Sequence, residues 1–270
     1  MDRRAVGVFD SGVGGLTAVR ELRKILPSEN IIYFGDTSRV PYGVRSRETL
    51  VEYSLQDVRF LRSMDVKAVL VACGTATTAS LPELQQANDV PVFGVVEAAC
   101  RRAAETTRSG KIGLIATDAS LRTGAYERTL RALNPKLEIT SRSCPLFVPL
   151  VENGRCRPGD VVIETVAREY LEPMKGKGID TLILGCTHYP LLSEVIQNIM
   201  GPDVTLISAG KEAADALRST LMEKDMLTDA RTGELRLFVS GEPENFTPLA
   251  EQFLGETIVH PVGRADIEQY

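Results

Sequence analysis

Two cysteines occupy equivalent positions in this sequence, each at the end of an apolar run that predicts a buried strand. Cys73 follows VLVA at residues 69–72, and Cys186 follows ILG at 183–185, 113 residues further along the chain. Both precede small or polar residues at a predicted helix start, where free backbone N–H groups and the helix dipole favour a thiolate. His188 lies two residues after Cys186. We therefore predict that both thiols are reactive, although most cysteines at strand ends are small buried hydrophobes.

The other three cysteines, Cys100, Cys144 and Cys156, lack such a setting, and we assign them to packing or to the surface. The five cysteines are odd in number and form no C-x-x-C pair, so we predict free thiols. The two histidines, His188 and His260, belong to no Cys/His cluster with ligand spacing, so no metal site is expected.

Two thiols on facing walls of a site suit one reaction type, the inversion of a carbon centre. Inversion needs a base on one face and an acid on the other, both within about 3–3.5 Å of the carbon. A hydrolase needs only one nucleophile. Asp10 in FDSGVGG and Glu152 in PLVENG are candidate carboxylates to polarise the thiols, one on each side. The alternatives are that Asp10 only caps a helix and that Glu152 is a solvated loop charge.

Composition points to a small-molecule partner. The chain is 43% apolar and 25% charged, with a net charge of -5 and no block of Lys or Arg, so nothing indicates binding to nucleic acid or to an anionic membrane. The N-terminus has too short an apolar stretch for a signal peptide, and no run of about 18 apolar residues occurs. We therefore expect a cytoplasmic protein.

Short runs rich in Val, Ile and Leu alternate with amphipathic segments, which predicts an α/β fold with mostly parallel sheets. The predicted strands are 5–9, 31–35, 68–72, 90–96, 111–116, 181–185, 204–208 and 236–240. A helix is expected from Leu16 to a stop at Pro27, and others at 160–173 and 189–200. Ser80 with Glu83 predicts a capping-box start for a further helix.

The two thiol-bearing segments belong to a faint internal repeat. AVLVACGT followed by VPVFGVV resembles TLILGCT followed by VTLISAG, and the segments 7–17 and 113–123 both lead from a strand through small residues into a helix. The repeat predicts two similar parallel-sheet domains facing each other. Ligands of such sheets bind beyond the carboxyl ends of the strands, where both thiols lie.

The loop DSGVGG at 10–15 invites a phosphate-binding interpretation, but the details do not fit. It has no G-K-[ST], and the dinucleotide pattern requires a glycine where Thr17 stands. What remains is Asp10 and Ser11 beside free backbone N–H groups, a combination suited to the ammonium and carboxylate of an amino acid.

A second polar loop, GDTSRVPYG at 35–43, follows the next predicted strand. By itself it is typical of a turn. Its position after a neighbouring parallel strand puts Asp36, Tyr42 and Gly43 on the same rim as Cys73, where the Gly43 N–H can meet a carboxylate.

Five motifs, in this order, resemble the cofactor-independent glutamate racemases. They are FDSGVGGLT (9–17), GDTSRVPYG (35–43), VACGTAT (71–77), PLVENG (149–154) and LGCTHYPLL (184–192), and the resemblance runs from about residue 5 to residue 210. It implies two α/β domains around a buried site, with residues 1–98 plus 209–270 in the first domain and 99–208 in the second. It also implies no pyridoxal phosphate or metal, production of D-glutamate for peptidoglycan, and a homodimer.

The resemblance also implies roles for individual residues. Cys73 faces the α-proton of the D-isomer, with Asp10 assisting. Cys186 faces that of the L-isomer, with Glu152 and His188 assisting. The implied substrate contacts are Asp10, Ser11, Pro41, Tyr42, Gly43, Gly74, Thr75, Thr117, Thr187 and His188.

One position departs from the family, which carries Asn-Thr after the first catalytic cysteine, where this chain has Gly74-Thr75. Losing a hydrogen bond to a charged ligand costs about 1.5–3 kcal/mol, which is about ten- to more than hundredfold in affinity. We therefore expect Gly74→Asn to lower KM for glutamate. The alternatives are a racemase for aspartate or another acidic amino acid, a glutamate-binding regulatory protein with little catalysis, and a hydrolase using Cys186 with His188.

Overall fold

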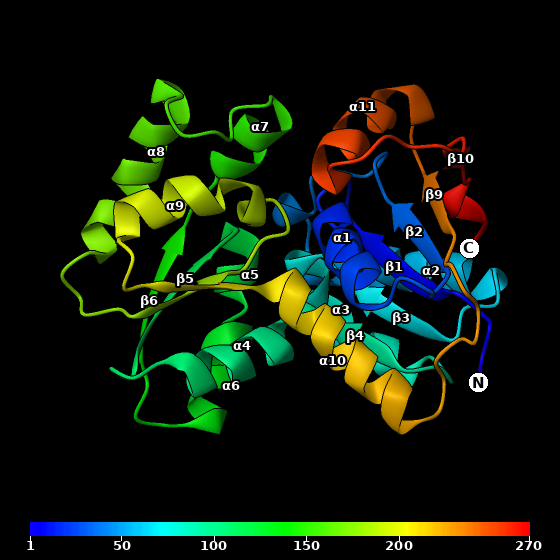
Figure 1. The fold of residues 1–270 in the computed structure, drawn as a ribbon, viewed down its shortest axis with the longest axis horizontal. Coiled ribbons are helices and arrows are strands. Elements are labelled where there is room, and N and C mark those ends of the chain that lie inside the picture. The colour runs from blue at the N-terminus through cyan, green and yellow to red at the C-terminus, as the bar shows by residue number, and fades with distance from the viewer.

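The computed structural model describes all 270 residues, and its strands form two separate sheets in which every pairing is parallel (Figure 1). The strands are β1 (Val6–Asp10), β2 (Ile31–Gly35), β3 (Ala68–Val71), β4 (Val92–Gly94), β5 (Lys111–Ala116), β6 (Glu138–Ser143), β7 (Thr181–Leu184), β8 (Thr205–Ser208), β9 (Leu235–Val239) and β10 (Gly263–Arg264). The first sheet has the order β10-β9-β2-β1-β3-β4, and the second has the order β6-β5-β7-β8.

Helices connect the strands and cover both sheets. The α-helices are α1 (Leu16–Ile25), α2 (Arg47–Ser63), α3 (Gly74–Gln86), α4 (Val95–Thr106), α5 (Asp118–Arg122), α6 (Ala125–Leu133), α7 (Phe147–Glu152), α8 (Val161–Leu171), α9 (Ser193–Met200), α10 (Ala209–Glu223) and α11 (Pro243–Leu254). Short 3-10 helices are η1 (Tyr42–Val44), η2 (Glu172–Met174), η3 (Tyr189–Leu192) and η4 (Ile267–Gln269). None of these helices combines the length and the apolar character needed to span a bilayer.

The two sheets share a common plan. The strands β2-β1-β3-β4 of the first sheet follow the same order as β6-β5-β7-β8 of the second, which confirms the predicted α/β fold with two similar halves. In this correspondence β3 matches β7. Cys73 follows β3 and Cys186 follows β7, so the two thiols lie after the carboxyl ends of equivalent strands in the two sheets.

Each face of the first sheet has its own helical layer, because alternate side chains along a strand point to opposite faces. Phe9 and Val71 pack in the apolar cluster that includes α2 and α3. Val8 and Leu70, one residue earlier in each strand, pack in the cluster that includes α1 and α10. Burial on both faces explains why these strands are continuous apolar runs in the sequence.

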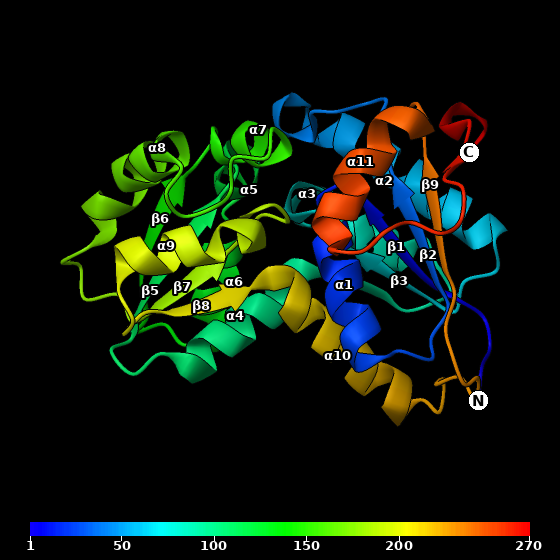
Figure 2. The same cartoon turned by 45° about the horizontal axis from the view of Figure 1, so that its top comes forward.

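The chain crosses between the sheets twice, through α4 on the way out and through α10 on the way back. These two helices pack against each other, and α10 also packs on α1. Figures 1 and 2 show α10 at the junction of the two lobes. One apolar cluster runs through both lobes, so a packed helical junction joins the halves.

Some local predictions were wrong. The helix expected to start at Ser80 starts at Gly74, and the buried Ser80 hydroxyl donates to the Ala76 carbonyl within α3 at 2.7 Å. The apolar run 90–96 is divided, since β4 ends at Gly94 and α4 follows directly. Strand β6 was not predicted, because its sequence EITSRS is polar and the strand lies at an exposed edge.

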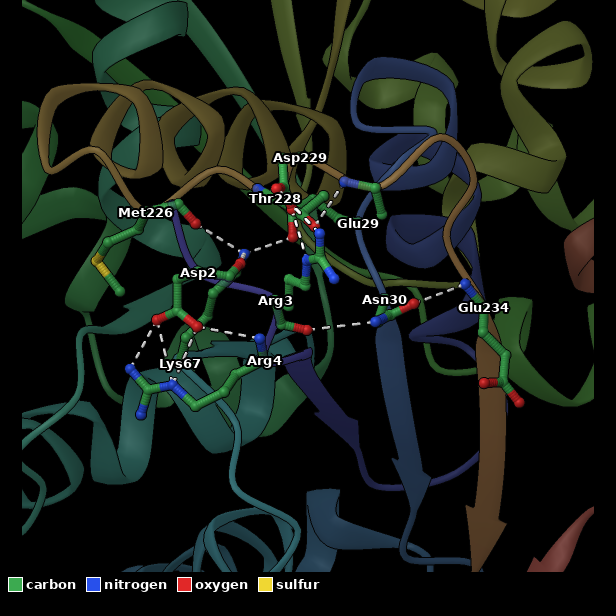
Figure 3. Close-up of polar contacts among 11 residues, drawn as sticks. Asp2, Arg3, Arg4, Glu29, Asn30, Lys67, Met226, Thr228, Asp229 and Glu234 are labelled. Atoms are coloured by element: carbon green, nitrogen blue, oxygen red, sulfur yellow. Dashed lines mark hydrogen bonds and ion pairs between the residues drawn. The ribbon is translucent and has the colours of Figure 1, made fainter.

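Lys67 is completely buried and ties three segments of the chain together (Figure 3). Its ammonium group donates to Glu29 Oε2 at 2.5 Å and to the carbonyls of Asp2 at 2.8 Å and Met226 at 2.7 Å. Glu29 Oε1 accepts the Thr228 N–H at 2.7 Å. All three ammonium protons therefore have acceptors, and they hold the N-terminus and the segment after α10 against the first sheet.

We expect Lys67→Met to lower the free energy of unfolding by about 3–5 kcal/mol, because it leaves the Glu29 carboxylate buried without its partner. Urea unfolding followed by circular dichroism measures this. The control is Arg101→Ala, which removes an exposed pair with Glu97 and should cost no more than about 0.5 kcal/mol. Equal effects of the two substitutions would contradict a stabilising role for Lys67.

Candidate active site

A cavity of about 420 Å³ lies between the carboxyl ends of the two sheets. It is lined by nearly all the residues predicted to act, namely Ser11, Pro41, Tyr42, Gly43, Cys73, Gly74, Thr75, Thr117, Glu152, Cys186, Thr187 and His188. Asp10 is the exception, because it is buried behind the wall. A larger groove of about 810 Å³ beside α4 and α10 contains none of these residues. No three His, Cys, Asp or Glu side chains are grouped so that they could hold a metal ion.

The first wall presents Cys73 at the N-terminus of α3. The Cys73 sulfur accepts the Ala76 N–H at 3.4 Å, and the thiol donates to Ser11 Oγ at 3.6 Å. Burial, together with the nearby Asp10 carboxylate, raises the pKa of Cys73 to about 12. The helix N-terminus was expected to favour a thiolate here, but burial outweighs it. At neutral pH Cys73 is a proton donor.

Asp10 ends β1 and lies behind Cys73. Its Oδ2 accepts the Gly12 N–H at 3.0 Å, and its Oδ1 is buried without a hydrogen-bond partner. The N-cap position of α1 is Gly15, so Asp10 does not occupy the cap position itself. Burial raises the pKa of Asp10, and the charge of His188 opposes that shift.

The second wall presents Cys186, His188 and Glu152 as a chain of contacts. The Cys186 sulfur lies 3.9 Å from His188 Nδ1, and His188 Nε2 lies 2.8 Å from Glu152 Oε1. Burial opposes a charge on the imidazole, but hydrogen bonding to Cys186 and Glu152 outweighs burial and raises the pKa of His188 to about 10. At neutral pH the ring is an imidazolium held between the sulfur and the carboxylate.

The two thiols therefore have different electrostatic surroundings. Cys73 is buried beside a carboxylate, whereas Cys186 is partly exposed to the cavity beside a cation. One wall thus supplies a neutral thiol, and the other supplies a sulfur with a cationic hydrogen-bond donor. Such a pair suits general acid catalysis on one side of a ligand and general base catalysis on the other.

Threonine hydroxyls join the two walls. Thr75 Oγ1 lies 3.2 Å from Thr117 Oγ1, and Thr17 Oγ1 donates to the Thr187 carbonyl at 2.8 Å. Thr17 and Thr75 belong to the first lobe, and Thr117 and Thr187 belong to the second. These two contacts connect the walls.

Comparison with known proteins identifies the family. The model of the Asp/Glu/Hydantoin racemase family matches residues 17–217 of this chain. The chain belongs to the Asp/Glu/Hydantoin racemase family.

Relatives within this racemase family are similar over nearly their whole length. The glutamate racemase of Geobacter metallireducens is 45% identical over 256 residues, which is 94% of each chain. The structure of glutamate racemase isoform RacE1 from Bacillus anthracis has a TM-score of 0.93 and 40% identity, and the match covers 98% of each chain. The structure of glutamate racemase from Francisella tularensis in complex with D-glutamate has a TM-score of 0.92 and 38% identity, with 100% of each chain covered.

Two residues of this racemase lie otherwise than expected. Tyr42 lines the cavity, but its hydroxyl points to buried carboxylates, at 2.5 Å from Asp36 Oδ2 and 2.9 Å from Asp57 Oδ2. It is therefore not available to a ligand. Cys144, assigned to packing or the surface, is buried but also lines the cavity.

Sequence reasoning missed several further lining residues, and Ser120 and Gly185 are two of them. Ser120 follows Thr117 by three residues, and the Thr117 side chain caps α5 by accepting the Ser120 N–H at 3.3 Å. The threonine at a helix start was a usable signal for Ser120. Gly185 carries no side-chain signal, and only its backbone takes part.

Gly74 meets Gly185 across the cavity, so the two walls approach each other through backbone. A Cβ atom added at Gly74 would lie 2.7 Å from the Gly185 carbonyl oxygen. That carbonyl cannot easily withdraw, because the Gly185 N–H donates to the Ile115 carbonyl at 2.8 Å. Backbone of the opposite wall thus occupies the space into which a side chain at position 74 would extend.

We expect the His188 ring to remain doubly protonated at pH 8, because its pKa is raised to about 10. Glu152→Gln removes an anionic partner and should lower this pKa. Imidazole ¹⁵N NMR signals measured against pH test both statements, with His260→Gln assigning the signal of the exposed second histidine. A neutral His188 ring at pH 8, or a pKa unchanged by Glu152→Gln, would contradict this account of the second wall.

Proposed function

We propose that this protein interconverts L- and D-glutamate by moving a proton on each face of the α-carbon. The observation that carries the proposal is that two thiols from equivalent strands of two facing sheets line one cavity, each with its own carboxylate nearby. The names of its relatives support glutamate as the substrate, and D-glutamate is bound in the Francisella tularensis structure.

The two walls have separate tasks in this mechanism. With L-glutamate, the Cys186 sulfur removes the α-proton as the C–H bond breaks, and the carbanion carries the electron pair. The Cys73 thiol then gives its proton to the opposite face, so the configuration inverts and Cys73 becomes the thiolate. The reverse direction exchanges the two roles. His188 and Glu152 assist at Cys186, and Asp10 assists at Cys73.

Polar groups around the thiols are suited to the charges of the substrate. The Gly43 N–H and the hydroxyls of Ser11, Thr75, Thr117 and Thr187 supply hydrogen bonds for its carboxylates, and Pro41 shapes the wall beside them. Backbone N–H groups and hydroxyls fixed in a cavity stabilise negative charge without reorganising. They therefore also suit the carbanion formed after proton removal.

In the cell, we propose that the enzyme supplies D-glutamate for peptidoglycan synthesis in the cytoplasm and works as a homodimer. Residues 1–98 plus 209–270 and residues 99–208 form its two domains. The strands of the first sheet come from residues 6–94 and 235–264 and those of the second from 111–208, which supports these boundaries.

Cys73→Ser and Cys186→Ser should each lower the rate of racemisation by about 10²–10⁴-fold, because each removes the acid or base on one face. The assay incubates L-glutamate in D₂O and follows optical rotation together with deuterium at the α-carbon. The matched control is Cys156→Ser, which lies outside the cavity and should keep wild-type activity. Near wild-type turnover in either cavity variant would refute the two-thiol mechanism.

The close contact at Gly74 reverses the expectation that asparagine there improves binding. Gly74→Ala and Gly74→Asn should lower kcat/KM, because either side chain forces the walls apart. Overpacking of this kind costs about 1–3 kcal/mol, or about five- to more than hundredfold. Steady-state kinetics with both variants test this. Steric exclusion requires Gly74→Asn to be at least as impaired as Gly74→Ala, and a lower KM for Gly74→Asn would contradict it.

A further inference from the structure

A buried polar cluster lies under the loop that carries Pro41 and Gly43. It consists of Asp36, Arg39, Tyr42 and Asp57, and both carboxylates are completely buried. Arg39 Nε donates to Asp36 Oδ2 at 2.6 Å, and Arg39 Nη2 donates to Asp57 Oδ1 at 2.9 Å. The cluster joins this loop to α2, which carries Asp57.

The cluster has too few hydrogen atoms to give each of its short oxygen–oxygen contacts a hydrogen if both carboxylates are ionised. The single Tyr42 hydroxyl lies 2.5 Å from Asp36 Oδ2 and 2.9 Å from Asp57 Oδ2, and it has only one hydrogen to donate. The contact left without that hydrogen must receive one from a carboxyl group. If both carboxylates were ionised, one of them would face the lone pairs of the Tyr42 oxygen with no hydrogen in between, and the two oxygens would repel each other.

The surrounding donors identify which carboxyl group carries the extra proton. Asp36 Oδ1 accepts the Ser240 hydroxyl at 2.8 Å, and Asp36 Oδ2 already accepts from Arg39. Asp57 Oδ2, in contrast, has no donor other than the shared Tyr42 hydroxyl. Asp36 therefore has the surroundings of a carboxylate, and Asp57 Oδ2 has those of an O–H group.

The charges agree with this count. Arg39 is the only cation in the cluster, so two ionised carboxylates would leave a net negative charge in a buried site. The groups facing Asp57 are Asp36 and Arg39 from the loop after β2 and Tyr42 from η1. Burial, and then the charge of Asp36, raise the pKa of Asp57 well above its ordinary value of 3.8.

We propose that Asp57 is a protonated positioning residue, donating through Oδ2 to the Tyr42 hydroxyl, which in turn donates to Asp36. The chain of donors fixes Tyr42, and the adjacent Gly43 backbone then faces the cavity in one orientation. Asp57 touches no ligand. It acts on substrate binding through the loop, and this functional part of the inference rests on the proposed racemase activity.

The sign of the pH dependence follows from the raised pKa. The folded protein keeps the Asp57 proton while the unfolded chain releases it, so this group lowers stability as pH rises from 3.8 toward the folded pKa. Asp57→Asn has no such proton to keep. Its urea midpoint relative to the wild type should therefore increase as the pH rises from about 5 to 8.

Asparagine is the decisive substitution, because it resembles a protonated aspartate. In Asp57→Asn, Oδ1 still accepts from Arg39 and Nδ2 donates to Tyr42, so KM for glutamate should stay within about twofold of wild type at pH 7. Asp57→Leu loses both bonds and should raise KM about tenfold or more, with a smaller change in kcat. If Asp57 were ionised, Asp57→Asn would instead raise KM as Asp57→Leu does, and that result would overturn the proposal.

Infrared spectroscopy tests the proton directly and needs neither substrate nor Asp57→Leu. At neutral pH the wild type should show the carbonyl absorption of a neutral carboxylic acid that is absent from Asp57→Asn. An identical carbonyl region in the two proteins, or a urea-midpoint difference that falls as pH rises, would overturn the proposal. A protein without racemase activity would show no glutamate turnover in any variant, whereas these two measurements would still decide the state of Asp57.

Discussion

The Gly185 carbonyl lies so close to Gly74 that a side chain at position 74 has no free space between the two walls of the cavity. A hydroxyl contact between Thr75 and Thr117 lies beside it, and Thr17 donates across the same boundary. Each half of the molecule carries only one of the two thiols. Small residues and hydroxyl contacts at this boundary let the two halves lie close together. The cavity can therefore have one wall from each half.

The halves share a strand order but not an electrostatic environment. Equivalent strands present Cys73 and Cys186, yet burial and a carboxylate hold the first as a thiol, while an imidazolium accompanies the second. A reaction that takes a proton from one face and delivers one to the other needs such a difference in the resting state. The shared strand order places the two thiols at equivalent positions, and their different burial and charged neighbours give them different protonation behaviour.

Buried ionic groups away from the cavity hold the elements that form it. Lys67 connects the N-terminus and the segment after α10 to the first sheet (Figure 3). The cluster around Arg39 anchors the loop that lines the first wall. Both clusters are buried, and isolated charges in such a place would be costly unless they are paired and hydrogen-bonded. Their hydrogen bonds fix the positions of otherwise irregular backbone.

The sequence by itself determined the α/β class, most strand ranges and the two thiols, because apolar runs and the residues after them are local patterns. The pairing of Asp10 with Cys73 and of Glu152 with Cys186 was implied by the family resemblance. Only the folded chain decided the protonation of Cys73 and the contact at Gly74, since burial and the distance between lobes depend on residues far apart in sequence. Ser80, a local helix-start signal, instead lies inside α3.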